Sequence, residues 1–321
     1  MTEPAIVLGP NQYGKAEVRV VKVTRETARH EIEDLNVTSQ LRGDFDRAHL
    51  AGDNSHVIAT DTQKNTVFAF ARGGIGSPEA FLLRLAEHFT SEFDWVSGGR
   101  WEAESFAWDR IEVQGAAHDH SFVRSGRETR TAVVVADGAA RHVIGGLKGL
   151  TVLKTTESGF EGFPRDQYTT LAETSDRVLA TDVAARWLYA RREGEGEGEG
   201  EGEGEGEGEG DGDGGPDYDA SYERVRALLL EAFAQRHSPA LQATLFEMGS
   251  RVLEECPEIA EIRFSMPNKH HFVVDLTPFG LDNPNEVFYA ADRPYGLIEA
   301  AVTREGVVSP AAAWEGIAGF C

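Results

Sequence analysis

The sequence predicts an α+β fold in which antiparallel strands and paired helices occur twice along the chain. Runs of β-branched and aromatic residues alternate with segments whose apolar residues recur at helical spacing. A Glu-Gly tract, EGEGEGEGEGEGEGEGEGDGDGG, begins at Glu193 and separates two groups of such segments. We expect two halves, residues 1–150 and 151–321, each an antiparallel sheet with two helices on one face, and the tract interrupts the second half.

Before the tract, the sequence predicts strands on either side of a well-marked helix. Ser77 has the chemistry of an N-cap, and Pro78 occupies the first helical position. Four apolar residues at helical spacing give this helix one apolar face: Phe81, Leu82, Leu85 and Phe89. β-branched and aromatic runs predict strands over residues 16–25, 56–72, 122–137 and 147–156. A second helix is expected over residues 166–181.

After the tract, two helical patterns precede three short strands. The first helix is expected over 222–236, and the second over 240–255 with Ser238 as its cap. Strands follow at residues 261–267, 270–276 and 286–292. The tract itself has no apolar side chain to bury, so we expect a disordered, solvated loop at about 193–215.

Composition excludes several classes of protein. The net charge is 31 − 54 = −23, which argues against nucleic acid as a partner. No run of about eighteen apolar residues is present to span a membrane. The first ten residues lack the pattern of a secretory signal and the chain ends in GFC instead of S-K-L, so we expect a cytoplasmic protein. Cys256 and Cys321 have neither disulfide-framework nor metal-ligand spacing.

The stretch GPNQYGK, which ends at Lys15, nearly matches a phosphate-binding loop. Ala16 stands where such a loop carries a hydroxyl for Mg²⁺, and a strand pattern follows where a helix is needed. A nucleotide site is therefore disfavoured. Lys15 lies at the head of a strand, where it is either an aimed side chain or a solvated surface lysine.

Other familiar motifs for chemistry are weak or missing. The histidine pairs His118/His120 and His270/His271 lack a third ligand at zinc-site spacing, so no metal site is predicted. Neither a nucleophile elbow nor a dinucleotide fingerprint follows a strand. Polar residues do interrupt apolar strands at Thr60 and Asp61 and at residues 268–270. They are either turn-formers or site residues, and Asn268 after a proline favours a turn.

Six separated motifs, in order, resemble urate oxidase (uricase), a cofactor-independent enzyme. They are NQYGKAEVRVVKV, TDTQKNTVFAFAR, LTVLKTTESGFEGFPRDQYTTLAETSDRVLATDV, HSPALQATLFEMG, PNKHHFVVDL and DNPNEVFYAADRPYGLIEA. The resemblance runs from about Val7 to Cys321 and departs clearly only at the Glu-Gly tract. It implies two tunnelling-fold (T-fold) halves, each with a four-stranded antiparallel sheet and two helices. It also implies a homotetramer that closes a barrel, with active sites at subunit interfaces.

The resemblance further implies a reaction and its residues. The reaction is urate + O₂ + H₂O → 5-hydroxyisourate + H₂O₂, with no metal or organic cofactor. One subunit would supply the catalytic dyad of Lys15 and Thr60, and the backbone around Asp61 would close one edge of the site. The residues expected from the neighbouring subunit are Phe160, Arg177, Leu241, Gln242, Asn268 and His270.

The residue types are consistent with these implied roles. Arg177 and Gln242 can hold the edge of a flat acidic purine, and Phe160 offers a stacking face. Thr60 is too weak a base alone, so a lysine made neutral by burial would take its proton. His270 would extend the relay or position a group, and Asn268 would hold O₂ and then water.

Two alternatives remain at this stage. A cyclohydrolase-like enzyme of the same fold would need a zinc-ligand cluster, which the sequence lacks. A non-catalytic purine-binding protein would keep the binding residues but would have no use for Lys15 and Thr60.

Overall fold

The computed structural model describes residues 5–190, 215–317 and 320. Two compact units are distinguished, and each is described separately. The first unit comprises Met1–Gly145, Tyr189–Asp219 and Pro310–Glu315, and the second comprises Gly146–Leu188, Ala220–Ser309 and Gly316–Cys321. The tract expected to be disordered lies, up to Gly214, outside the described residues, as does the terminal Cys321.

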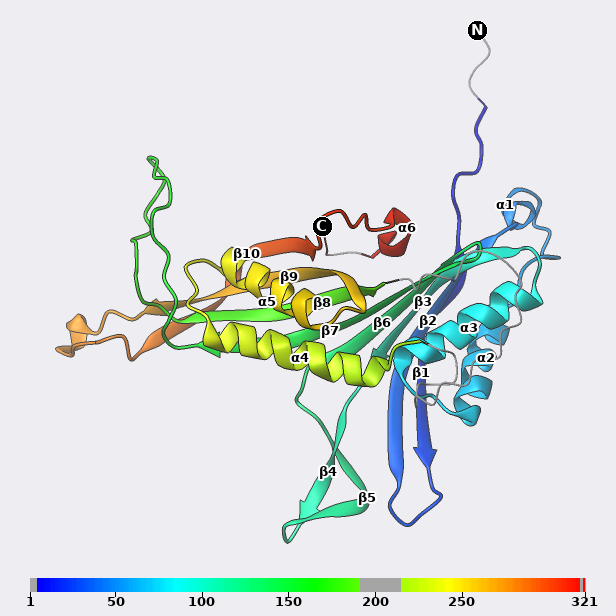
Figure 1. The fold of residues 1–321 in the computed structure, drawn as a ribbon, viewed down its shortest axis with the longest axis horizontal. Helices are drawn as coiled ribbons and strands as arrows, with labels where there is room; N and C mark the ends of the chain where they lie inside the picture. The colour runs from blue at the N-terminus through cyan, green and yellow to red at the C-terminus, as the bar shows by residue number, and fades with distance from the viewer. Residues whose placement is uncertain (1–4, 191–214, 318–319, 321) are drawn as a thin grey trace. The chain divides into compact units, whose positions relative to one another are not determined.

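The first unit is an antiparallel sheet with helices on one face. Its strands are β1 (Tyr13–Thr24), β2 (Glu31–Gly43), β3 (Val96–Ser105) and β6 (Thr129–Asp137), in the order β1-β2-β3-β6. Helix α2 (Thr60–Gly73) packs on β1, and α3 (Pro78–Glu92) packs on β3 and β6 (Figure 1). The unit also contains the short helices α1 (Asp46–Ala51) and α6 (Ala311–Trp314) and a separate two-stranded sheet of β4 (Trp108–Val113) and β5 (Ala116–Arg124).

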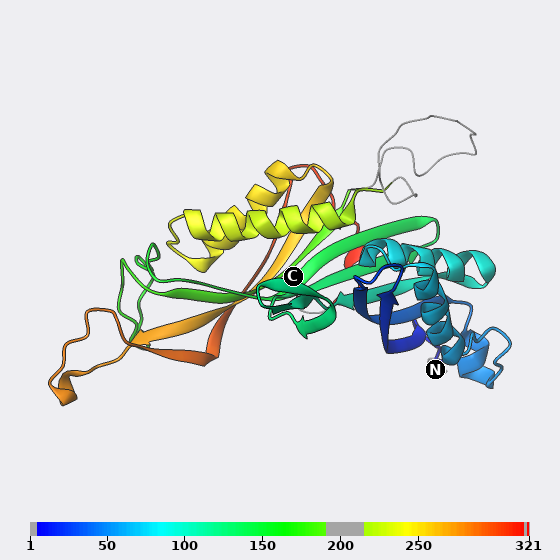
Figure 2. The same ribbon diagram turned by 90° about the horizontal axis from the view of Figure 1, so that it is seen from below.

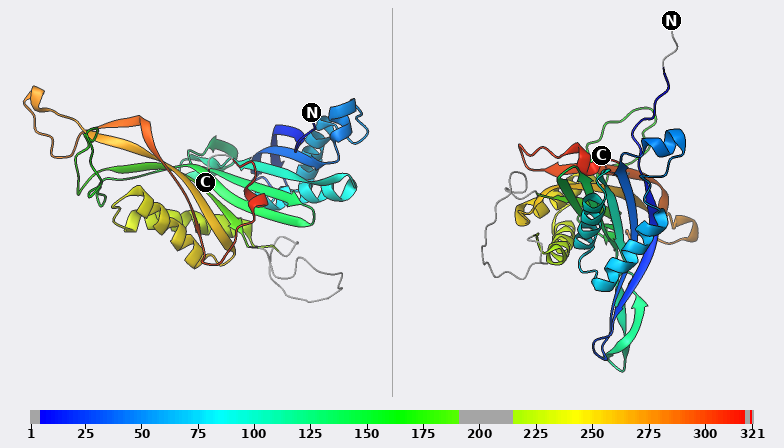
Figure 3. Two further views of the ribbon diagram at one scale, coloured as in Figure 1. Left: turned by 90° about the horizontal axis from the view of Figure 1, so that it is seen from above. Right: turned by 90° about the vertical axis from the view of Figure 1, so that its right-hand side faces the viewer.

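The second unit repeats this plan. Strand β7 (Ala140–Lys154) begins in the first unit and ends in the second, and the order continues with β8 (Leu179–Tyr189), β9 (Ile259–Val273) and β10 (Phe288–Thr303). Helices α4 (Tyr218–Gln235) and α5 (Leu241–Glu255) lie side by side against the strands (Figures 2 and 3). A single 3₁₀ turn, η1 (Thr277–Phe279), lies between β9 and β10.

The buried side chains of β8 show which face of the second sheet the helices cover. Val183, Ala185 and Trp187 are fully buried, and the Trp187 ring lies 6.2 Å from the ring of Tyr222 in α4. Asp182, which alternates with them, is therefore on the helix-free face. This alternation is the expected pattern for a sheet with helices on one side.

The predicted helix at Ser77 is confirmed in detail. The Ser77 hydroxyl accepts a hydrogen bond from the N–H of Ala80 at 3.3 Å, and Pro78 is the first helical residue. All four residues of the predicted apolar face are fully buried: Phe81, Leu82, Leu85 and Phe89. The helices expected over 222–236 and 240–255 are also confirmed, as α4 and α5.

The strand predicted over residues 56–72 is wrong, because Thr60–Gly73 is helix α2. Gln63, Val67 and Ala71 recur every fourth residue and are buried, while α2 packs against β1. Burial of this helical stripe outweighs the strand propensity of a few aromatic and β-branched residues.

The helix predicted over residues 166–181 is also wrong. The Asp166 carboxylate accepts hydrogen bonds from the Tyr168 N–H at 2.9 Å and the Thr169 hydroxyl at 3.0 Å, which stabilises a turn. Tyr168 and Leu171 are exposed, so the segment has no apolar stripe to hold a helix. Only its last residues are regular, as the start of β8.

Two local predictions in the second half need correction. Ser238 is not the cap of α5, since Ala240 holds that position; the Ser238 hydroxyl instead bonds the hydroxyl of Thr244. Asn268 is not in a turn, because β9 continues from Ile259 to Val273. Pairing of Asn268 with Gly296 of β10 keeps the backbone extended after Pro267.

Candidate functional site

Lys15 and Thr60 are brought near each other by a tyrosine on β1. The Tyr13 hydroxyl accepts a hydrogen bond from the Ile58 N–H at 2.7 Å and donates one to the Ile58 carbonyl at 3.1 Å. Tyr13 and Lys15 are two residues apart on a strand, and Ile58 precedes Thr60 by two. These two bonds therefore hold the start of α2 against the head of β1, where the two predicted catalytic side chains lie, both half-buried.

The backbone around Lys15 is shaped by a close approach and a bulge. A Cβ at Gly14 would lie 1.7 Å from the Ser39 carbonyl oxygen, so this position has room only for glycine. The register shifts between Lys15 and Val18, and Glu17 there has a φ of 57°. Its N–H donates to the Thr38 hydroxyl at 3.1 Å instead of continuing the ladder. Bulges of this kind re-aim the neighbouring side chains of a strand.

The first turn of α2 has uncapped backbone N–H groups, and the carboxylate of its acidic residue, Asp61, is hydrogen-bonded within the helix. No side chain caps the helix at Ala59, so the N–H groups of its first turn are available to an acceptor. The Asp61 carboxylate bonds Lys64, and Asn65 donates to it at 3.0 Å. The bond and the charge of Lys64 chiefly lower the Asp61 pKa, with a smaller contribution from nearby Lys15. The Asp61 carboxylate is therefore engaged within α2, while no side chain caps the first turn of that helix.

Four of the predicted residues meet in one cavity of the second unit. The cavity has a volume of about 330 Å³, and Phe160, Arg177, Asn268 and His270 contribute to its lining. Its other lining residues come from the segment after β7, the end of β9 and the start of β10. A cavity of this size, with one cation and several polar groups, is within the range of small-molecule sites.

Phe160 and Arg177 are held together by short-range contacts. Phe160 forms an isolated bridge with Thr174, through bonds of 2.7 and 3.1 Å. The Arg177 N–H donates to the Ser158 carbonyl at 2.8 Å, and its Nε donates to the Ser158 hydroxyl at 3.3 Å. The guanidinium carbon lies 5.3 Å from the centroid of the Phe160 ring. Burial lowers the Arg177 pKa, as expected for a half-buried cation.

The surroundings of His270 favour its neutral form. Its pKa is lowered by burial first, and then by the charges of Arg177 and His271. A neutral imidazole near pH 7 can accept a proton or orient a water molecule. Asn268 lies two residues before it, on the same face of β9, and lines the same cavity.

Leu241 and Gln242 are not among the residues that line this cavity. Leu241 is 2 % exposed, so its side chain belongs to the core, and Gln242 is exposed at the start of α5. Two backbone bonds tie this region to the cavity: the Ser238 N–H donates to Glu157 at 2.8 Å, and the Gly159 N–H donates to Ser238 at 3.0 Å. The helix has no side-chain cap, so its first N–H groups are available near Phe160.

Several lining residues were not predicted from the sequence. They include Thr155, Thr174, Asp176, His271 and Phe288. Thr155 and Thr174 flank Phe160 in a segment that was partly expected to be helical. Asp176 accepts a hydrogen bond from Thr156 at 2.9 Å, which has no sequence signature.

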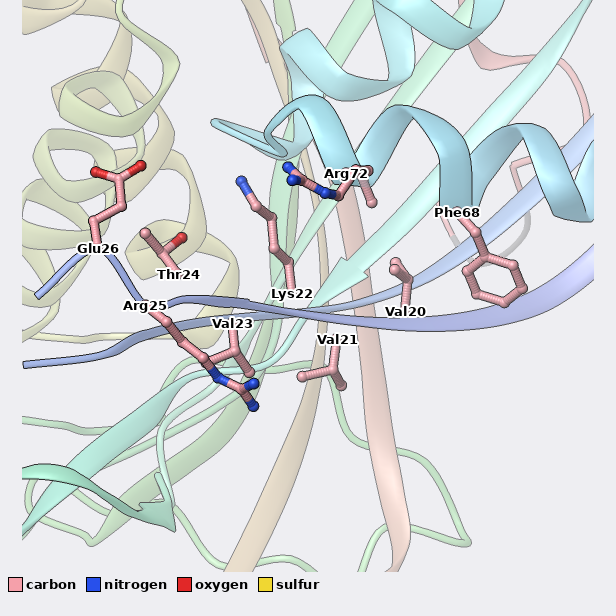
Figure 4. Close-up of a pocket in the computed structure, with 10 residues that line it drawn as sticks. Val20, Val21, Lys22, Val23, Thr24, Arg25, Glu26, Phe68 and Arg72 are labelled. Carbon is pink, nitrogen blue, oxygen red and sulfur yellow. The ribbon is translucent and has the colours of Figure 1, made fainter. Parts of the chain in front are cut away.

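A larger groove, of about 570 Å³, lies in the first unit between β1 and α2 (Figure 4). Lys22 and Arg72 converge in it, and Phe68 lies at its other end (Figure 4). Lys22 is directly opposite Glu33 on β2, and Arg72 is in the last turn of α2, where a cation is favourable. The groove contains none of the predicted site residues.

Among the described residues, no group of three His, Cys, Asp or Glu side chains is arranged to hold a metal ion. His118 and His120 lie with ring centroids 4.5 Å apart on β5. In the same part of the chain, no helix is long and apolar enough to cross a membrane.

Comparison with known proteins agrees with the sequence resemblance. A family model described as uricase matches residues 11–135 and 143–299. The uricase of Arthrobacter globiformis is 61% identical over 320 residues, which cover 100% of this chain and 97% of that protein. The crystal structure of uricase from the same organism matches with a TM-score of 0.86 at 60% identity, over 97% of this chain and 99% of that one. A hyperthermostable mutant of Bacillus sp. TB-90 urate oxidase shares the fold, with a TM-score of 0.73 at 22% identity, over 92% and 99%.

Proposed function

This chain belongs to the uricase family and catalyses the oxidation of urate by O₂, and we propose that it uses two half-sites without a metal or organic cofactor. Its fold is the tunnelling fold of that family. One observation carries the proposal: Phe160 and Arg177 line a single cavity with Asn268 and His270, which lie about 90 or more positions further along the chain. Lys15 lies near the head of β1 and Thr60 at the start of α2, two segments that the hydrogen bond between Tyr13 and Ile58 joins.

We assign urate binding to the second unit. Urate is a flat acid, and the Arg177 guanidinium can donate two parallel hydrogen bonds to its edge while Phe160 stacks on its face. Gln242 and the free N–H of Leu241 would supply further donors from the start of α5. The lowered pKa of Arg177 does not remove its charge near neutral pH, because guanidinium titrates far above that range.

We assign proton transfer chiefly to the first unit. The Thr60 hydroxyl would take a proton from the substrate and pass one to Lys15, and the N–H of Asp61 would close the facing edge. His270, kept neutral in its cavity, would extend this relay from the other side or orient water. Asn268 would hold O₂, and then the attacking water, over the ring.

The redox balance is met by the substrate itself. Urate loses two electrons and two protons to O₂, which becomes H₂O₂, and water adds to the oxidised purine to give 5-hydroxyisourate. The protein's residues position the reactants and move protons. This assignment distinguishes the enzyme from a purine-binding relative, for which Lys15 and Thr60 would have no role.

We further propose that the full site forms between chains of a homotetramer located in the cytoplasm. The support is that the predicted dyad belongs to the first unit and the cavity to the second. Among the described residues, β1 and β10 stand at the two ends of the strand order, and strand pairing between copies would cover their free edges. We take the two halves, 1–150 and 151–321, as the two T-fold repeats.

The test is urate-dependent oxygen uptake by protein stripped of metal with a chelator, with Thr60→Ala alongside. Uptake that survives chelation and collapses in the variant is the expected result. Uptake that requires added metal would overturn the cofactor-free mechanism. Tight urate binding without uptake would instead indicate a purine-binding protein.

A further inference from the structure

Lys269 lies between Asn268 and His270 on β9, but it points away from their cavity. Successive side chains of a strand alternate between faces, and Lys269 is not among the residues that line the cavity. Its ammonium instead donates to the Asp182 carboxylate of β8 at 2.7 Å. The same carboxylate accepts a hydrogen bond from the hydroxyl of Thr151 on β7. One side-chain network thus links three neighbouring strands on the helix-free face.

The backbone of β9 loses its other support at this position. His270 pairs with Ala291 of β10, and Asn268 pairs with Gly296. On β9, only Lys269 separates Asn268 from His270. On β10, the four residues 292–295 separate their partners, Ala291 and Gly296, so β10 bulges away opposite Lys269. The regular ladder is interrupted where the two site residues project. The link from Lys269 to β8 therefore holds the strand where β10 does not.

We propose that Lys269, anchored by Asp182 and Thr151, is a positioning residue that fixes the placement of Asn268 and His270. This inference rests on the proposed roles of those two residues. It adds a group that acts on the reaction through the strand, without touching urate. Because both partners are about one-third exposed (31% and 34%), the ion pair contributes little to global stability.

The state of Asp182 agrees with this role. Burial opposes its ionisation, but the hydrogen bonds from Lys269 and Thr151 outweigh burial, so its pKa is lowered. The carboxylate is therefore charged near neutral pH, where the lowered pKa of His270 also favours a neutral imidazole. The anchor and the histidine can be present in the required forms together.

The test compares Lys269→Met, Lys269→Arg and Asp182→Asn in the full-length enzyme by urate steady-state kinetics and thermal unfolding. Loss of the anchor should lower kcat by about tenfold or more, since a small misplacement of a reacting group can cost up to about 100-fold. KM should change little, because Arg177 and Phe160 are untouched. Lys269→Arg, which can still reach the carboxylate, should recover most of kcat, and Lys269→Met combined with Asp182→Asn should be no worse than either alone.

Two further variants distinguish a positioning role of Lys269 from a general effect of losing an ion pair and from a wrong site assignment. Arg224→Met removes another ion pair of this unit, which joins α4 to Glu255 at 2.8 Å, and should leave kcat unchanged. Wild-type kcat in Lys269→Met and Asp182→Asn, or an equal loss in Arg224→Met, would overturn the positioning role. Asn268→Ala tests the proposed site itself: if it keeps wild-type kcat, the site assignment fails, whereas an impaired Asn268→Ala with unaffected Lys269→Met refutes the anchor alone.

Discussion

The two proposed half-sites differ in how the fold positions their residues. In the first unit, backbone geometry positions the residues. Gly14 allows a close approach between strands, a bulge follows Lys15, and Thr60 is the first residue of a helix that has no side-chain cap. In the second unit, side chains converge on a cavity, where Arg177 lies beside the ring of Phe160. The first arrangement suits proton transfer and the second suits ligand binding. Substitutions should therefore separate kcat from KM according to the unit that they affect.

Thr60→Ala should have the largest effect, entirely on kcat. Removing a group that transfers a proton in the transition state costs about 10²–10⁴-fold in rate. Urate affinity should remain, because the cavity of the second unit is intact. Steady-state oxygen uptake, together with urate binding by calorimetry, measures the two quantities separately.

Asp61→Asn is the neighbouring control for this prediction. The Asp61 carboxylate is engaged by Lys64 and Asn65, so its removal leaves the backbone N–H in place. Its kcat should stay close to that of the wild type. A loss as large as that of Thr60→Ala would show that the carboxylate itself takes part in the chemistry.

Arg177→Gln should come next, and it should act on binding. A hydrogen bond to a charged group contributes about 1.5–3 kcal/mol, so the urate Kd should rise by about 10- to 150-fold. Arg165→Gln is a matched control, because Arg165 lies over the Phe163 ring at 5.6 Å but does not line the cavity. Equal weakening by both substitutions would place urate elsewhere.

The free energy of unfolding should depend on pH through a buried glutamate of the first unit, Glu79. Glu79 of α3 is fully buried against Arg130, at 2.7 Å, and burial raises its pKa from 4.5 to about 7. The folded state therefore binds this proton more tightly than the unfolded state does. The favourable contribution is complete below pH 4.5 and is lost as pH rises through about 7.

Comparison with Glu79→Gln isolates this contribution. The free energy of unfolding of the wild type, relative to the variant, should fall between pH 5 and pH 8 in urea titrations. A difference that does not vary with pH would show that Glu79 is ionised throughout. Activity limited by His270 should follow a separate profile, with its acidic limb below the ordinary histidine value of 6.5.

Ser77→Ala should have the smallest effect and none on catalysis. The Ser77 side chain caps α3, and its loss costs about 1 kcal/mol of stability. Helices α2 and α5, whose starts are assigned to the site, have no such cap. Urea unfolding should detect the change while kcat and KM stay at wild-type values. A change in kcat would mean that α3 also influences the site.

The elements that could be predicted are those with local signals. The Ser77-Pro78 cap and its apolar stripe specified α3, and the helices after the tract had clear apolar patterns. Residues 56–72 were mispredicted because packing on β1 selected the helical stripe of Gln63, Val67 and Ala71. Residue type alone favoured a turn at Asn268, because nothing local reveals its partner strand, β10.

The site residues also divide into those that the sequence could indicate and those that depend on the folded sheet. The family resemblance supplied Lys15, Thr60 and four of the residues that line the cavity, whereas residue types alone left each one open. The contribution of Lys269 depends on a bulge in β10 and on a carboxylate 87 positions away. Contacts at such separations arise only from the folded sheet, so no local pattern predicts them.

The central claim is that one chain supplies the dyad and another supplies the cavity. Co-expression of Thr60→Ala with Arg177→Gln, each impaired alone, tests it most directly. In a mixed oligomer, some sites would combine the intact first unit of one chain with the intact second unit of another. We predict oxygen uptake well above the sum of the separate variants. If co-expression restores no activity although mixed oligomers are isolated with two affinity tags, each site lies within a single chain and the account is contradicted.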